Sequence, residues 1–381
     1  MEARGRVRLA LGHREADRVP FDLGGTGVTL IHLTAYMNLR RYLGLAERRP
    51  QIAYMAEQLA VVDPDMMDRL EVDAVPVKPQ APLGFQYEFR DEGAYEAYTD
   101  EWGIGWRKPK VGGFYYDMYQ HPLAGAEALR DLKAFEFPDP LDENRFRHLR
   151  RDAEAAAATG KAVALASICP GMLEVYSWLR GYEQFYIDMA ANHRFVEYML
   201  DRMVEFKRAY WQRALGEIGD LVDVVCEADD MAGQQALLFS PDVYRTVVKP
   251  RHVKLFAAIK SYAPVKLFFH SCGAVRPLLK DLIEAGIDIL NPVQISAAGM
   301  DPQELKREFG RDLVFWGGGV DTQGVLGSGT PELVREHVRR NIEVLKPGGG
   351  FVFATVHDIQ ANVPPENIMA MWETWKEYGA Y

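Results

Sequence analysis

The sequence predicts one α/β domain, a single (β/α)₈ barrel that spans residues 1–381. Apolar runs and amphipathic helical segments alternate at least five times in the second half of the chain. The apolar runs are continuous, which is typical of parallel strands that are buried on both faces. No Gly-rich nucleotide fingerprint accompanies these units, and no Ser/Gly linker divides the chain. A doubly wound parallel sheet is the alternative, because periodicity does not reveal whether a sheet closes.

The first half of the chain contains the earlier strands. Apolar runs at 73–79 and 161–170 predict two barrel strands, and an N-terminal extension precedes them. Residues 84–122, between the two runs, consist of aromatic segments that glycines interrupt. We interpret this stretch as a β-hairpin insertion after the first barrel strand.

The second half predicts a regular succession of strands and helices. Apolar residues recur at spacings of three and four from about 183 to 215, which predicts one long helix. Ser240 and Pro241 suit the N-cap and the first turn of a later helix. We expect strands at 221–230, 264–273, 288–294, 312–320 and 351–359, and helices at 240–262, 274–286, 301–310 and 330–345.

Composition excludes several classes of protein. With 44 Lys+Arg against 54 Asp+Glu, the formal net charge is −10, which argues against a nucleic-acid partner. The hydrophobic share of 48% excludes a disordered chain. No run approaches the ~18 apolar residues of a membrane span, and the charged first twenty residues lack the apolar core of a signal peptide, so we expect a cytoplasmic protein. The three cysteines form no disulfide framework, which leaves free thiols.

Polar residues gather where the predicted strands end, which is where a βα barrel carries its active site. The opposite ends of the strands carry nothing comparable. The residues at these strand ends are Cys169, Glu227, Asp229, Asp230, His270, Cys272, Asn291, Gln294, Gly317 to Gly319, Asp321, Thr322, His357 and Asp358.

His270 and Cys272 form the sharpest candidate site. Residues two apart on a strand point to the same side, and an imidazole together with a thiolate suits Zn²⁺. The alternative is a buried Cys beside a polar His. A third ligand must come from another strand, and His357 is the best candidate because the last strand of a closed barrel lies beside the first. Glu227 and Cys226 are the other candidates, although adjacent residues point to opposite faces.

Glu227, Asp229 and Asp230 place up to three carboxylates at one strand end. Crowded like charges raise at least one pKa, which suits an acid–base or ligand role. The alternative is a solvated loop in which an Asp caps the next element. His252 lies in a helical pattern among charged neighbours, and we interpret it as a surface residue.

The chain resembles the uroporphyrinogen decarboxylase superfamily, and the resemblance covers nearly all of it. It is carried by the segments 16–25, 227–252, 267–294, 313–334 and 347–368. The resemblance implies a single (β/α)₈ barrel. It also implies an enzyme, either a decarboxylase or a corrinoid-dependent methyltransferase, which are the two broad branches of the superfamily.

Two motifs favour the methyltransferase branch. The decarboxylase uses an arginine-rich motif to hold its substrate carboxylates, whereas residues 19–29 contain no arginine here. The pair His270 and Cys272 is similar to the zinc motif of the corrinoid-dependent methyltransferases. These enzymes transfer methyl groups between methoxy compounds, methylamines or methanol, a cobalamin-carrying protein, and a thiol or folate acceptor. Their usual distant Cys is replaced here by His357, which fits members that demethylate methoxy compounds or methylate folate.

The resemblance implies a zinc-dependent methyltransferase that moves a methyl group between a small methoxy compound or an acceptor and a corrinoid (cobalamin) protein. Zn²⁺ held by His270, Cys272 and either His357 or Glu227 would act as a Lewis acid. Catalytic roles fall to Glu227, Asp229 and His357, and a homodimer is common in the superfamily. The residues expected to bind substrate are Asn291, Gln294, Asp321 and Tyr115.

Two other functions remain open at this point. The first is a metal-free decarboxylase or lyase, for which Arg180 and Arg107 are the available basic groups. The second is a carrier that binds a corrinoid or tetrapyrrole without catalysis. Bound zinc distinguishes the methyltransferase from both, because neither alternative needs a metal.

Overall fold

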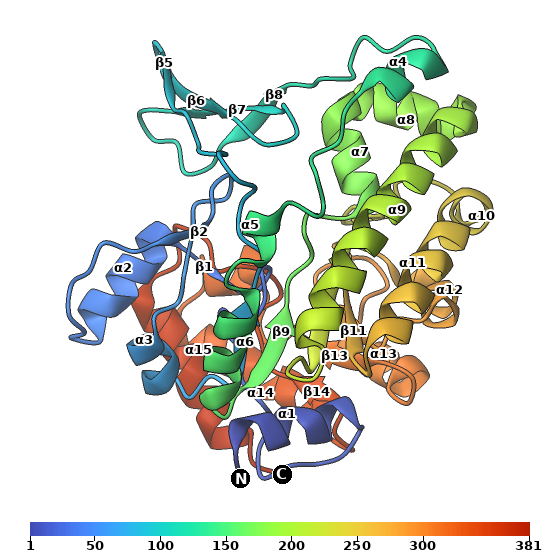
Figure 1. The fold of residues 1–381 in the computed structure, drawn as a ribbon. Helices are drawn as coiled ribbons and strands as arrows, with labels where there is room; N and C mark the ends of the chain where they lie inside the picture. Colours follow the sequence, from blue (N-terminus) through green and yellow to red (C-terminus); the bar gives the residue numbers. More distant parts are fainter.

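A curled parallel sheet forms the centre of the computed structural model, which describes residues 1–381 (Figure 1). Its seven strands are ordered β14-β13-β12-β11-β10-β9-β4. Within this sheet, each strand therefore lies beside the one that precedes it along the chain, and β5 to β8 belong to another sheet. This order, with a helix between most strands, confirms the predicted barrel-type α/β fold. The strands are β4 (Ala74–Val77), β9 (Ala162–Leu165), β10 (Val224–Ala228), β11 (Lys266–His270), β12 (Ile289–Asn291), β13 (Val314–Trp316) and β14 (Phe351–Val352).

A short extended segment, residues 20–22, lies between the two edges of this sheet. Phe21 forms a parallel bridge with Phe353, and the Asp22 amide donates to the Phe353 carbonyl at 2.8 Å. On the other side, the Asp73 amide donates to the Phe21 carbonyl at 2.8 Å, directly before β4. The segment therefore joins β14 to β4 and completes the ring. It does so as a bridge rather than as an eighth full strand.

The inside of the barrel is filled by small and apolar side chains. The amino-terminal end is covered by α1 (Ala3–Leu11), whose buried face packs against the interior residues of the strands. Because α1 covers this end, an active site can open to solvent only at the opposite, carboxyl-terminal end of the barrel. Both chain termini lie at the end that α1 covers (Figure 1). The residues of this inner cluster include Val7, Ala10, Leu11, Ala162, Ala164, Val224, Phe268, Ile289, Val314 and Trp316.

Helices surround the strands and pack against their outward faces. None of them combines the length and the apolar character that a membrane crossing requires. The main helices are α6 (Leu149–Ala158), α7 (Met172–Arg180), α8 (Tyr182–Ala191), α9 (His193–Ile218), α11 (Lys249–Tyr262), α12 (Leu279–Ala285), α13 (Pro302–Phe309), α14 (Pro331–Leu345) and α15 (Pro365–Tyr378). The remaining helices are α2 (Leu33–Tyr42), α3 (Pro64–Arg69), α4 (Leu129–Ala134), α5 (Glu143–Phe146) and α10 (Pro241–Val243).

Two predicted helices show how local sequence sets their bounds. The long helix expected from about 183 to 215 is divided into α8 and α9 at Asn192, whose φ of −134° and ψ of 54° lie outside the helical region. The predicted helix start at Ser240 is confirmed, because its hydroxyl accepts a hydrogen bond from the Val243 amide at 3.2 Å.

A second sheet stands over the open end of the barrel (Figure 1). It is antiparallel and consists of β5 (Arg90–Glu92), β6 (Tyr95–Thr99), β7 (Gly105–Pro109) and β8 (Asp117–Gln120). The sequence led us to expect a hairpin in this region, whereas the structure has four strands. A third, small sheet joins β1 (Ile31–His32), β3 (Leu59–Ala60) and β2 (Ile52–Tyr54).

Candidate metal centre

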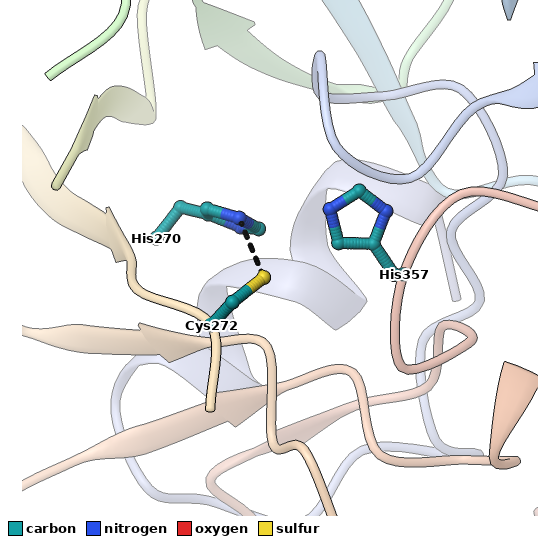
Figure 2. A group of neighbouring side chains, drawn as sticks. All are labelled: His270, Cys272 and His357. Carbon is teal, nitrogen blue, oxygen red and sulfur yellow. Dashed lines mark hydrogen bonds between the residues drawn. The ribbon is translucent and has the colours of Figure 1, made fainter. Parts of the chain in front are cut away.

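Three side chains with metal-binding atoms meet at the carboxyl-terminal end of the barrel (Figure 2). His270 ends β11, Cys272 follows two residues later, and His357 lies in the loop after β14. Their ligand atoms are all within 4.8 Å of one another, and 3.4 Å separates His270 Nε2 from Cys272 Sγ. Donor atoms of a tetrahedral zinc site lie about 3.4–3.8 Å apart, given bonds of ~2.0–2.3 Å. The group therefore needs only small side-chain movements to fit zinc, and His357 lies where the sequence predicted it.

The orientation of the His270 ring is set by Asn291. The Asn291 amide nitrogen donates to the Trp316 carbonyl at 2.7 Å, so its Oδ1 faces His270 Nδ1, 2.6 Å away, as an acceptor. Nδ1 therefore carries the proton, and Nε2 keeps a lone pair that is directed toward Cys272. This is the tautomer that a metal ligand requires.

Burial and neighbouring charges decide the protonation of the two strand-end ligands. Burial lowers the pKa of His270 to about 4, so the ring is neutral at pH 7. Burial also raises the pKa of the Cys272 thiol well above its usual range, and the carboxylates of Asp230, Glu174 and Asp358 add to this. A bound cation would reverse the effect on Cys272, because metal coordination stabilises the thiolate.

Carboxylates surround the three ligand atoms. Asp230 accepts a hydrogen bond from the Cys272 amide at 2.7 Å, and one of its oxygens is 3.9 Å from His270 Nε2. The Asp358 amide donates to His357 Nδ1 at 2.8 Å, and the Asp358 carboxylate lies 3.4 Å from the same nitrogen, so both groups hold this ring at Nδ1. Both the donor set and this acidic surrounding fit a divalent cation such as zinc.

Glu174 and Glu57 are acidic residues of this region that the sequence analysis did not identify. Glu174 accepts from the Gly171 amide at 2.9 Å in the first turn of α7, and burial together with Asp230 and Asp229 raises its pKa. Burial likewise raises the pKa of Glu57, with a smaller contribution from Asp358. A Glu three residues after a helix N-cap is a capping signal, but nothing in the sequence places Glu57 near the barrel.

Glu227 is not part of this group, which corrects its prediction as a ligand and catalytic acid. It faces α9, where its carboxylate accepts hydrogen bonds from Lys207 Nζ at 2.8 Å and Trp211 Nε1 at 2.6 Å, and also from Ser167 at 3.0 Å. The register pairs Ala228 with His270, so Glu227 points to the opposite face of the strand. Both oxygens of the carboxylate accept hydrogen bonds from side chains of α9.

Asp229 also lies outside the ligand group, and its catalytic role stays a prediction. It is fully buried; one oxygen accepts from the Leu173 amide at 2.6 Å in the first turn of α7, and the other lies 2.8 Å from His252 Nε2. The interpretation of His252 as a surface residue is wrong, because only 1% of it is exposed. Its charged sequence neighbours lie on the outer side of α11, while the ring points inward. Asp229 therefore anchors α7 and α11 to the strand end.

The predicted substrate ligands lie near the centre in supporting positions. Gln294 accepts from the Gly273 amide at 2.6 Å, and Asp321 accepts from the Gly324 amide at 2.8 Å. The Tyr115 hydroxyl, from the loop before β8, donates to the Gln360 side chain at 2.5 Å. These contacts stabilise the loops around the metal centre. A role of these residues, or of Asn291, in holding substrate stays a prediction.

Two of the glycines at 317–319 occupy positions where a side chain would be strained or would clash. Gly318 has a φ of +78°, which favours glycine. A Cβ atom at Gly319 would lie 2.4 Å from the Phe353 ring. The triplet therefore allows the chain to turn after β13 and to pack closely against Phe353.

Comparison with known proteins adds the family. The model of the uroporphyrinogen decarboxylase (URO-D) family matches residues 119–378. The chain belongs to this family. The chain is also similar to a methyltransferase from Methanosarcina mazei, with a TM-score of 0.66, 18% identity and 99% coverage of both chains. At this identity the likeness concerns the fold.

Two other solved structures resemble this chain less than the methyltransferase does. Xylanase 10B from Thermotoga maritima has a TM-score of 0.38 and 13% identity, over 61% of this chain and 80% of that one. An endo-1,4-β-xylanase from Penicillium canescens has a TM-score of 0.36 and 12% identity, over 64% and 81% of the two chains. No curated protein matches the sequence.

Proposed function

We propose that this URO-D protein is a zinc-dependent methyltransferase, which moves a methyl group between a small methylated substrate and the corrinoid of a partner protein. The observation that carries the proposal is the group of His270, Cys272 and His357 at the catalytic end of the barrel. Membership of the URO-D family and a fold shared with a methyltransferase are consistent with it. Methoxy compounds are the substrate class that the sequence favours.

The ligand residues would hold zinc as two neutral imidazoles and one thiolate. Zinc, when bound, supplies a Lewis acid for the heteroatom that carries or receives the methyl group. Asn291 holds His270 in the tautomer that exposes Nε2, and the Asp358 amide orients His357 by donating to its Nδ1. Asp230 fixes the Cys272 backbone. The chain therefore contributes a pre-oriented site whose negative charge favours a dication.

The surrounding charges oppose the decarboxylase alternative. A carboxylate-rich substrate needs cations at the barrel mouth. Arg180 is buried in an ion pair with Asp188 at 2.7 Å, and Arg107 lies over the rings of Tyr95 and Tyr119 on the insertion sheet. Neither guanidinium is available to hold such a substrate beside the acidic metal centre.

The first test is elemental analysis of the purified full chain after zinc loading and removal of free metal. We expect about one zinc per chain in the wild type and none in Cys272→Ser, because a hydroxyl is a poor zinc ligand. Cys226→Ala is the matched control, since this cysteine also packs against the barrel interior but lies outside the ligand group. Methylation of cob(I)alamin by methoxy compounds should follow the zinc content across the three proteins.

The outcomes separate the candidate functions. Retained zinc and retained turnover in both Cys272→Ser and His270→Ala would contradict the proposal. Absence of zinc from the wild type after loading would favour the metal-free decarboxylase or the corrinoid carrier instead.

A further inference from the structure

A cavity of about 390 Å³ opens between the insertion sheet and the helices that follow β9. Its walls come from β7, β8, α7 and α8 and from the loop after β2. The size lies at the low end of the range for small-molecule sites, which suits a ligand of a few heavy atoms. The side chains that the argument below uses are Trp106, Trp178, Tyr116, Tyr182, Glu57 and Asp117.

Aromatic rings form much of this lining. Trp106 and Trp178 meet edge to face, with ring centroids 5.5 Å apart and an interplanar angle of 89°. Tyr116, buried directly before β8, and Tyr182, half exposed at the start of α8, complete the set. An ammonium already lies near one of these rings, since Lys108 Nζ is 4.7 Å from the centroid of Tyr116. Lys108 itself does not line the cavity.

The charged groups of the lining are acidic. The Glu57 carboxylate makes no ion pair and no hydrogen bond to another residue. Asp117 makes no ion pair either. No Lys or Arg lines the cavity. The Nδ1 of His121 lies 2.6 Å from the Trp178 carbonyl and donates to it.

Charged residues around the metal centre affect the pKa values of two residues of the cavity lining. Burial raises the pKa of Glu57, and the charges of Asp358 and His357 act on it. On the other wall, the carboxylates of Glu174 and Asp230 act on Tyr182.

We propose that this cavity binds the ammonium group of an organic cation. Cations are attracted to the faces of Trp and Tyr rings, also at exposed sites such as this one, where Glu57 and Asp117 face solvent. A carboxylate without a partner adds to the attraction, and it would repel an acidic ligand. This inference goes beyond the proposed function and does not depend on it.

The test compares choline with 3,3-dimethylbutan-1-ol, which has the same shape but a carbon in place of the charged nitrogen. Isothermal titration of the full chain needs neither zinc nor a corrinoid. We expect choline to bind at least about tenfold more tightly than the alcohol, because only choline gains the cation–π and carboxylate attraction. Equal affinities, or no choline binding up to about 10 mM, would overturn the proposal.

Variants locate the binding. Glu57→Gln should weaken choline binding about tenfold and leave the alcohol unchanged. Trp178→Leu should weaken choline as well. The matched control is Glu377→Gln, which changes an exposed glutamate of α15 that makes no ion pair. Unchanged choline affinity in both Glu57→Gln and Trp178→Leu would place the site elsewhere and contradict the proposal.

The two proposals fail separately. If the wild type binds choline but Cys272→Ser keeps its zinc and turnover, the cation site stands and the zinc mechanism falls. If Cys272→Ser loses zinc and activity but choline and the alcohol bind equally, the zinc mechanism stands and the cation site falls.

Discussion

Asn291 holds His270 in place: its Oδ1 accepts the Nδ1 proton of the ring at 2.6 Å, while its Nδ2 donates to the Trp316 carbonyl at 2.7 Å. Both side chains are buried at the ends of neighbouring strands, β11 and β12, and the register pairs them directly. The amide thus fixes both the rotation and the tautomer of the imidazole. Its role in metal binding can be tested without changing a ligand.

Asn291→Leu should weaken zinc binding about 10–100-fold, because the ring loses the partner that orients it. Competition with a chromogenic chelator measures the affinity. Asn291→Asp should restore part of it, since a carboxylate also accepts from Nδ1. The control is Asn367→Leu, which removes a buried amide of α15 that bonds the Leu326 carbonyl. Equal zinc affinity in wild type and Asn291→Leu would exclude an orienting role.

The metal-free protein should lose stability as pH falls from about 6.5 to about 4. His270 has a folded-state pKa of about 4, below the ordinary value of 6.5, because it is buried. Between these values the unfolded chain binds a proton that the folded chain does not, so acid favours unfolding. Carboxyl groups with raised pKa values, such as Asp358, have the opposite effect. The His270 contribution is therefore the difference between the wild type and His270→Gln.

Urea titrations at pH 7 and pH 5 measure this difference. Between pH 7 and pH 5, the free energy of unfolding should decrease more for the wild type than for His270→Gln, which has no imidazole to protonate. Parallel pH profiles for the two proteins would show that His270 is not held neutral by the fold.

Lys207→Met should lower the free energy of unfolding by about 3–5 kcal/mol, because it leaves the Glu227 charge buried without a partner. The two side chains are 0% and 1% exposed and 2.8 Å apart. Zinc content should not change, since Glu227 faces α9. Lys254→Met, which breaks the exposed pair with Glu205, should cost at most ~1 kcal/mol. Loss of zinc from folded Lys207→Met would restore Glu227 as a candidate ligand.

Asp73→Ala should destabilise the closure of the barrel. The Asp73 carboxylate is 1% exposed, pairs with Arg6 and Arg18 at 2.6 Å each, and accepts from the Phe21 amide at 2.8 Å. We expect a loss of about 3–5 kcal/mol in urea unfolding. Asp68→Ala, at a side chain that is 75% exposed, should change stability by no more than ~0.5 kcal/mol. Similar effects of the two substitutions would mean that the contacts of Asp73 at the barrel closure contribute little to the free energy of unfolding.

Local sequence determined those features that depend on neighbours along the chain. Continuous apolar runs predicted the parallel strands of the second half, and Ser240 marked the start of a helix. The pairing of His270 with Cys272 follows from their spacing of two residues at the end of one strand. The approach of His357 followed only once a closed barrel was assumed, because that closure brings distant strand ends together.

Tertiary structure alone decided which polar side chains reach the metal centre. A strand has two faces, and only the packing of α9 shows that the Glu227 side is the outer one. His252 has charged neighbours in sequence, yet its ring is buried against Asp229. Glu57 and Trp178 belong to segments far apart in the chain, so no local pattern relates them. Sequence periodicity records whether a side chain points in or out of its own element, whereas the contacts that it makes there depend on how the elements pack.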